Sequence, residues 1–131
     1  MSLQPVPIQN VPGVPDYTCT AFLPKSSDYC LLIPVINEGS RILTELGRAQ
    51  KAGVDRLVDI VICDGGSTDG SMNPDTLELY GVNTLLVKTG PGKQGAQLRM
   101  GLHFALTFGY KGVLTIDGNN KDSIEDVPEF V

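Results

Sequence analysis

Carboxylates stand next to the apolar runs of this chain, and they are its most suggestive residues for chemistry. Asp64 and Asp117 each come directly after a fully apolar run, and Glu38 follows another one closely. Carboxylates gathered in one place repel each other, so such a site needs a cation, or ligand hydroxyl and amino groups, to balance their charge. The structural alternative, that Asp simply suits turns and helix caps, stays open for Asp69 and Asp122.

The elements that must position these carboxylates alternate between apolar runs and segments with helical spacing. The predicted strands are Tyr29–Val35, Asp59–Cys63, Thr84–Val87 and Val113–Ile116. The predicted helices are Glu38–Ala52, Pro74–Tyr80 and Gln94–Phe108, with a last short helix capped by Ser123. This alternation predicts an α/β fold, a Rossmann-like three-layer sandwich with a mostly parallel sheet.

Ligands of such sheets bind outside the carboxyl ends of the strands. Four loops are therefore expected at one edge of the sheet: Asn37–Glu38, Asp64–Gly70, Thr89–Gly95 and Asp117–Asp122. Before this pattern, residues 1–27 contain five prolines that disfavour regular hydrogen bonding, which predicts an irregular N-terminal arm. Residues 28–131 are then expected to form one domain.

Composition excludes several classes of function. The 131 residues carry 10 Lys and Arg against 15 Asp and Glu, a net charge of −5, with no basic block, so we expect no nucleic acid partner. No apolar run is long enough for a membrane segment. Cys19, Cys30 and Cys63 lack the spacing of a zinc site, which predicts buried, reduced thiols and a cytoplasmic protein.

Two short motifs offer alternative functions. Gly90, Gly92 and Gly95 match the GxGxxG pattern between a strand and a helix, which would make the chain a non-catalytic Rossmann-type dinucleotide-binding module. Against this interpretation, Pro91 stiffens the turn, and the turn follows the third predicted strand rather than the first. Residues 64–68 resemble the first phosphate loop of actin-like ATPases, but a helix rather than a hairpin follows here.

Taken together, the four loops resemble a known family. The segments LLIPVINEG (31–39), VICDGGSTDGS (61–71), GKQGAQLRMG (92–101) and LTIDGNNKD (114–122) are similar to the ordered motifs of family 2 glycosyltransferases of the GT-A fold. The similarity covers about residues 29–131, and the dolichol-phosphate mannose synthase branch looks nearest. It implies the nucleotide-sugar-binding half of an inverting hexosyltransferase. The acceptor, a polyprenyl phosphate or a glycan, and the general base are expected to belong to a part after Val131, so the chain alone is expected to be inactive.

The resemblance also implies roles for individual residues. Four residues at or just after the end of the first strand would border the nucleoside: Pro34, Val35, Asn37 and Glu38. Asp64 would accept hydrogen bonds from the base edge. Arg99, helped by Lys93, would lie near the diphosphate, because a guanidinium pairs well with phosphate oxygens. Asp117 would contact the ribose or the metal-bound diphosphate.

A divalent cation, Mg²⁺ or Mn²⁺, would be held by Asp117, Asn119 and Asp122. Asn119 stands where the family usually has a second Asp, and a neutral amide oxygen lowers metal affinity. Ile36 and Gly65 also depart from the family pattern, so nucleoside stacking and metal dependence stay open. The chain could also be a degenerate family member with only a binding role. The oligomeric state stays open, as does a location at the cytoplasmic face of a membrane in a longer protein.

Overall fold

Six strands form one mixed sheet in the computed structural model, which describes residues 5–92, 94–120 and 123–130. The strand order is β1-β2-β5-β4-β3-β6, and the pairings among β5, β4, β3 and β6 are parallel. These four strands span Tyr29–Val35 (β3), Asp59–Asp64 (β4), Val82–Lys88 (β5) and Gly112–Thr115 (β6). The predicted α/β class is confirmed, and the mostly parallel sheet is consistent with a Rossmann-like fold.

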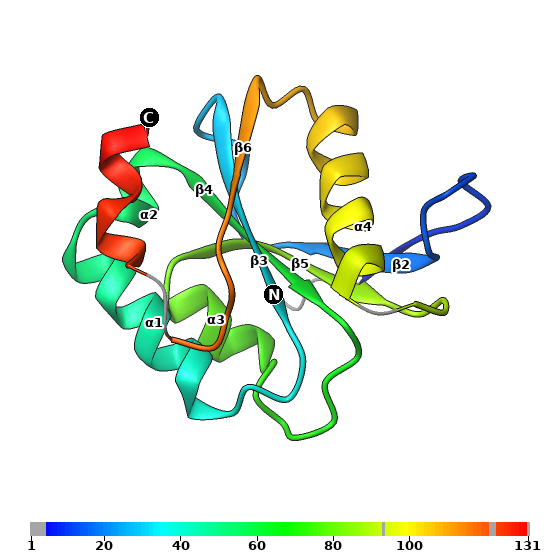
Figure 1. Cartoon of the computed structure of the whole chain (residues 1–131), viewed down its shortest axis with the longest axis horizontal. Helices are drawn as coiled ribbons and strands as arrows, with labels where there is room; N and C mark the ends of the chain where they lie inside the picture. Colours follow the sequence, from blue (N-terminus) through cyan, green and yellow to red (C-terminus); the bar gives the residue numbers. More distant parts are fainter. Residues whose placement is uncertain (1–4, 93, 121–122, 131) are drawn as a thin grey trace.

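Helices lie against both faces of this sheet (Figure 1). They are α1 (Ser40–Lys51), α2 (Val54–Leu57), α3 (Pro74–Leu79), α4 (Gln94–Thr107) and the 3-10 helix η1 (Ile124–Phe130). Successive side chains of a strand point to opposite faces. Leu31 and Ile33 of β3 therefore pack in one core cluster with α1, whereas Leu32 packs in the other with Met100 and Phe104 of α4.

The chain reverses its direction of travel across the sheet between β3 and β6. From β3 it moves to β4 and then to β5, and α4 then carries it back to β6 on the other side of β3. The crevice outside the carboxyl ends of the strands at such a reversal is where open α/β sheets bind ligands. The loops after β3 and β6 therefore flank the favoured position for a site.

The predicted irregular arm over residues 1–27 is wrong for two segments. Strand β2 (Tyr17–Ala21) pairs antiparallel with β5, and β1 (Val6–Ile8) pairs antiparallel with β2. The residues of β2 are mostly aromatic or β-branched and lie between prolines rather than at them, so they can pair on both sides. Pro7 is tolerated because β1 is an edge strand.

The buried face of α4 also differs from the predicted one. Helical spacing predicts Phe104, Leu106 and Phe108 on the apolar face of this helix. Phe104 is buried as predicted, but Leu106 and Phe108 are 80% and 54% exposed, and Met100 is buried. The reason is close packing at Gly101, where an added Cβ would lie 2.8 Å from Cys63 Sγ. The helix turns its small residues toward the sheet, and this rotation directs the leucines outward.

The three cysteines are free thiols and are buried, as predicted. Burial raises the pKa of Cys30 to about 12 and also raises the pKa of Cys63. The position of His103 in the middle of a helix predicts a partly buried structural residue. In the structure its Nδ1 lies 2.7 Å from the Tyr17 hydroxyl, a contact that links α4 to β2. No helix among the described residues has the length and apolar character needed to span a membrane.

Candidate functional site

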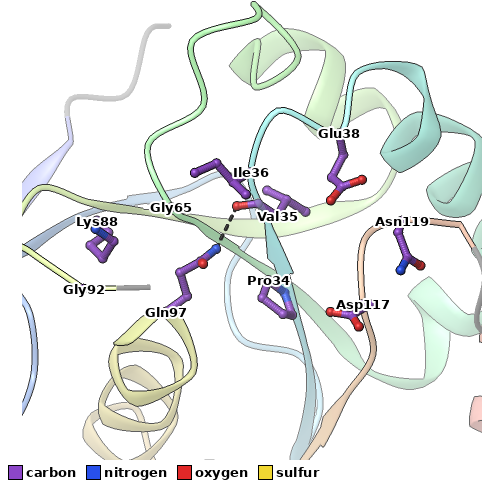
Figure 2. A pocket seen from close by; sticks show the side chains of 10 residues that line it. All are labelled: Pro34, Val35, Ile36, Glu38, Gly65, Lys88, Gly92, Gln97, Asp117 and Asn119. Carbon is purple, nitrogen blue, oxygen red and sulfur yellow. Dashed lines mark hydrogen bonds between the residues drawn. The ribbon is translucent and has the colours of Figure 1, made fainter. Parts of the chain in front are cut away.

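A pocket of about 440 Å³ opens at the carboxyl edge of the parallel strands. Residues from all four predicted loops, and one residue from α4, line it (Figure 2). They are Pro34, Val35, Ile36 and Glu38 after or at the end of β3, Gly65 after β4, Lys88 and Gly92 around the end of β5, Asp117 and Asn119 after β6, and Gln97 of α4. The expected convergence of the loops is therefore present, at the reversal point between β3 and β6.

The carboxylates gather on one side of the pocket. Glu38, Asp117 and Asn119 lie together there, and Lys88 lies on the opposite side (Figure 2). The Glu38 side chain is only 18% exposed, and its Oε2 is buried without a hydrogen bond, although Arg41 Nε is 3.1 Å away as an ion-pair partner. Arg41 balances the charge of this carboxylate, and a ligand that brings a hydrogen-bond donor would satisfy the buried oxygen.

The oxygen donors at this end fit a divalent cation only in part. Carboxylate and amide oxygens are suitable ligands for Mg²⁺. Within 5–92, 94–120 and 123–130, however, no three His, Cys, Asp or Glu side chains are close enough to hold a metal ion. A metal site here would need the Asn119 amide beside Asp117 and Glu38, or Asp122, which lies outside the described residues.

Asp64, expected to contact the base, does not line the pocket. It is 2% exposed, and its carboxylate accepts hydrogen bonds from Ser67 N at 3.0 and 3.2 Å and from Ser67 Oγ at 2.6 Å. These bonds close the turn that follows β4. In this structure Asp64 therefore fixes the loop, and Gly65, directly after it, forms the wall of the pocket.

Asn37 has a similar linking position between two loops. Its backbone, at φ 47°, donates from N to Ser67 Oγ at 2.9 Å, and its Oδ1 accepts from Thr68 N at 2.8 Å. Asp69 adds a third link by accepting from Gly39 N at 3.0 Å. Hydrogen bonds from the Ser71 side chain and backbone, with a weaker one from Gly39, lower the pKa of Asp69. The loops after β3 and β4 thus form one cross-linked unit.

Helix α1 holds the loop that follows β6. Glu45, fully buried, accepts from Asn120 N at 3.1 Å, and Arg48 Nη1 donates to Asn120 Oδ1 at 2.6 Å. Arg48 also donates to both carboxylate oxygens of Glu125, at 2.7 and 2.6 Å. The hydrogen bond from Arg48 lowers the pKa of Glu125 to about 2. These contacts fix the backbone next to Asn119, at the acidic end of the pocket.

The basic residues are arranged differently from the expectation. Arg99 is exposed and does not line the pocket; its Nε donates to Gly13 O at 2.9 Å. Lys88 lines the pocket instead, with Nζ donating to Gly90 O at 2.8 Å. Lys93 lies outside the described residues. Sequence reasoning missed Lys88, although its place at the end of a parallel strand was a usable signal.

Gln97 was missed as well. It lies on the buried face of α4, where a polar residue among Ala96, Met100 and Phe104 is unusual. A polar residue within an apolar helix face was the only signal in the sequence for Gln97. This signal does not reveal which groups the side chain contacts. Ile36 and Gly65 had been noticed only as departures from the family pattern, and both line the pocket.

Local packing explains two glycines of the GxGxxG pattern without a bound dinucleotide. A Cβ at Gly90 would lie 2.8 Å from Asp16 N, and one at Gly92, which has φ 125°, would overlap the Ala96 side chain. Gly90 therefore allows the turn to pack on the segment before β2, and Gly92 allows it to enter α4. The turn also follows β5, two strands away from β3 and the reversal point. These observations weigh against the dinucleotide interpretation.

Comparison with known proteins adds no family to this description. No protein-family model matches the sequence, and no match was found to a curated protein or to a solved structure.

Proposed function

We propose that the pocket binds the nucleoside diphosphate of a sugar nucleotide, and that the chain is the donor-binding half of a family 2 glycosyltransferase with the three-layer GT-A fold. One observation carries this proposal: the loops after four parallel strands line a single pocket at the reversal point, with Glu38, Asp117 and Asn119 at one end. That is the position at which doubly wound sheets bind nucleotides.

The two sides of the pocket suit different parts of such a ligand. Gly65 offers backbone without a side chain, and the neighbouring Ile36 is 52% exposed, so this side offers apolar surface to a nucleobase. The acidic end offers acceptors for sugar or ribose hydroxyls. A divalent cation bound there by Asp117 and Asn119 would supply positive charge to the diphosphate. Lys88 adds a cation on the opposite side, which attracts a polyanionic ligand.

The reaction that follows from this proposal is sugar transfer with inversion. The groups described here bind and orient the donor and stabilise charge on the leaving diphosphate. A carboxylate base and the groups that bind the acceptor, a polyprenyl phosphate or a glycan, would come from a longer protein, working in the cytoplasm or at the cytoplasmic face of a membrane. The 131-residue chain is then expected to bind the donor without transferring sugar.

Calorimetric titration tests the proposal directly. We expect saturable binding of UDP-glucose or GDP-mannose in the presence of Mn²⁺, and no comparable binding of NAD⁺ without metal. Asp117→Asn should weaken Mn²⁺-dependent binding, because it removes charge at the acidic end. The matched control is Asp126→Asn on η1, an exposed carboxylate that does not line the pocket. Binding of NAD⁺ alone, or of neither sugar nucleotide, would contradict the proposal.

A further inference from the structure

Gln97 occupies the middle of the pocket wall and is almost completely buried. Its side chain is 4% exposed in the folded chain, yet it reaches the pocket from α4 (Figure 2). Its Nε2 donates to Val35 O at 2.7 Å and to Cys63 O at 2.9 Å. One amide group therefore joins the carboxyl ends of β3 and β4 directly beneath the site.

These two bonds fix the orientation of the amide. Both partners are backbone carbonyl oxygens, which only accept hydrogen bonds, so the atom facing them must be the NH₂ nitrogen. Both hydrogens of that nitrogen are used. The carbonyl oxygen Oε1 must then point away from the strand ends, and no described residue donates a hydrogen bond to it.

Gly65 is fitted to this arrangement. A Cβ at position 65 would lie 3.0 Å from Gln97 Cδ and Nε2 and 3.1 Å from Oε1. A side chain at this position would force the amide to shift by a few tenths of an ångström. The glycine therefore explains why the amide can lie against the loop after β4, and it leaves Oε1 beside a wall that has no side chain of its own.

The carboxylates near the pocket do not face the wall formed by Gly65 (Figure 2). The Asp64 carboxylate, which is the acceptor that the sequence suggests, is turned into its own loop by Ser67. The remaining carboxylates stand at the acidic end with Asn119, away from Gly65 (Figure 2). A base that lies against Gly65 and Ile36 would instead meet the Gln97 amide.

We propose that Gln97 is a specificity-determining residue of this pocket, whose Oε1 accepts a hydrogen bond from a ring N–H on the nucleobase edge. This inference rests on the proposed function, because it assumes that the ligand is a nucleotide. The same residue also positions the site, since its two Nε2 bonds hold the ends of β3 and β4 together. Among the four common ribonucleotide bases, uracil and guanine carry a ring N–H at that edge, so UDP and GDP are the probes.

Methylated nucleotides test the hydrogen bond. With Mn²⁺ present, N3-methyl-UDP is compared with UDP, and N1-methyl-GDP with GDP, for the wild-type chain and for Gln97→Met. For the accepted base, methylation should weaken wild-type binding. This loss should shrink by roughly 2- to 10-fold in Gln97→Met, the range of one neutral hydrogen bond. The matched control, Gln50→Met, removes a Gln whose Nε2 donates to Leu79 O at 3.0 Å outside the pocket, and it should keep the full wild-type loss.

A second measurement is independent of any ligand and of the variant's stability. In amide NMR of the wild-type chain, the side-chain NH₂ of Gln97 should exchange with solvent at least 10-fold more slowly than that of Gln50, because both of its hydrogens are bonded and buried. Equal exchange rates would overturn the positioning role and the orientation of Oε1. An unchanged methylation loss in Gln97→Met would overturn the specificity role alone. Failure of both UDP and GDP to bind the wild-type chain would overturn the proposed function, and this inference with it.

Discussion

Arg48 and Asn120 join two parts of the chain that are 72 residues apart. Arg48 Nη1 on α1 donates to Asn120 Oδ1 at 2.6 Å, immediately after Asn119 at the acidic end of the pocket. Helix α1 starts from the loop after β3, so the same helix supports both sides of the reversal point. The width of the pocket therefore depends on contacts of α1 with the loop after β6 as well as on the sheet.

The ion pair between Arg48 and Glu125 predicts a pH dependence of stability. The pKa of Glu125 falls from 4.5 to about 2 in the folded chain because Arg48 hydrogen bonds to its carboxylate. A lowered acid pKa stabilises the folded state at pH values above the unfolded pKa, and this contribution is lost as the pH falls from about 4.5 toward 2. In urea unfolding at a series of pH values, Glu125→Gln should be less stable than wild type at pH 7, with a difference that shrinks across this window. Glu129→Gln, at an exposed position of the same 3-10 helix, is the control. A difference that stays constant from pH 7 to pH 2 would contradict the prediction.

We expect replacement of Asp64 to lower the stability of the fold, because its carboxylate bonds to its own loop and does not line the pocket. Replacing it with Ala removes the acceptor for Ser67 N and Oγ inside a buried turn. Hydrogen bonds to a charged group contribute about 1.5–3 kcal/mol each, so Asp64→Ala should lower the free energy of unfolding by at least that amount. Equilibrium urea unfolding measures it. Asp75→Ala, in the first turn of α3 and exposed, is the comparison, with a change below about 1 kcal/mol. If Asp64→Ala were as stable as wild type and lost only ligand affinity, Asp64 would be a ligand contact after all.

Lys88 and Arg99 are predicted to differ in their effect on ligand binding. Lys88 lines the pocket, whereas Arg99 is tied to Gly13 O outside it. Lys88→Gln should weaken UDP-glucose binding by roughly 2- to 10-fold, and the effect should decrease with added salt, since it is electrostatic. Arg99→Gln should leave the affinity within about 2-fold of wild type. Titration calorimetry at two salt concentrations measures both. A loss of affinity in Arg99→Gln alone would restore the role that the sequence had suggested for the guanidinium.

Gly101 and Gly47 are a matched pair of helical glycines. A Cβ at Gly101 would lie 2.8 Å from Cys63 Sγ and 3.0 Å from Leu32 Cδ1, so Gly101→Ala should cost about 1–3 kcal/mol by overpacking. A Cβ at Gly47 on α1 would meet Tyr80 Cε2 at an ordinary 3.9 Å. Gly47→Ala should therefore stabilise the chain by about 0.5–1 kcal/mol. Thermal unfolding of both variants checks the pair. A stabilising Gly101→Ala would mean that α4 does not pack closely on β3 and β4.

The sequence predicted the parallel part of the fold because its signals are local. Continuous apolar runs such as Leu31–Val35 and Ile60–Cys63 indicate strands buried on both faces, and Gly53 ends a helix by adopting a left-handed conformation at φ 77°. The alternation of strands and helices then places the loops at one edge. Strand β2 was missed because its pairing with β5 is a contact between distant residues, which no local pattern reveals.

The position of the pocket could be predicted in the same way, but the direction of each side chain could not. Asp64 and Asn37 carry suitable groups, yet Asp64 accepts hydrogen bonds inside its own loop and Asn37 bonds to the neighbouring loop. Gln97 reaches the pocket only because α4 turns its Gly101 side to the sheet. These outcomes depend on how a helix rotates and how loops pair, and they follow from packing across the whole domain.

The long separation between Arg48 and Asn120 has a consequence for biosynthesis. A nascent chain that has emerged from the ribosome only as far as α4 already contains three of the four loops, but it lacks the strand that completes the reversal and the residues that Arg48 and Glu45 hold. Such an intermediate would expose the side of β3 that β6 later covers. Binding competence should therefore appear late in synthesis and abruptly, once residues around Asn120 can dock on α1.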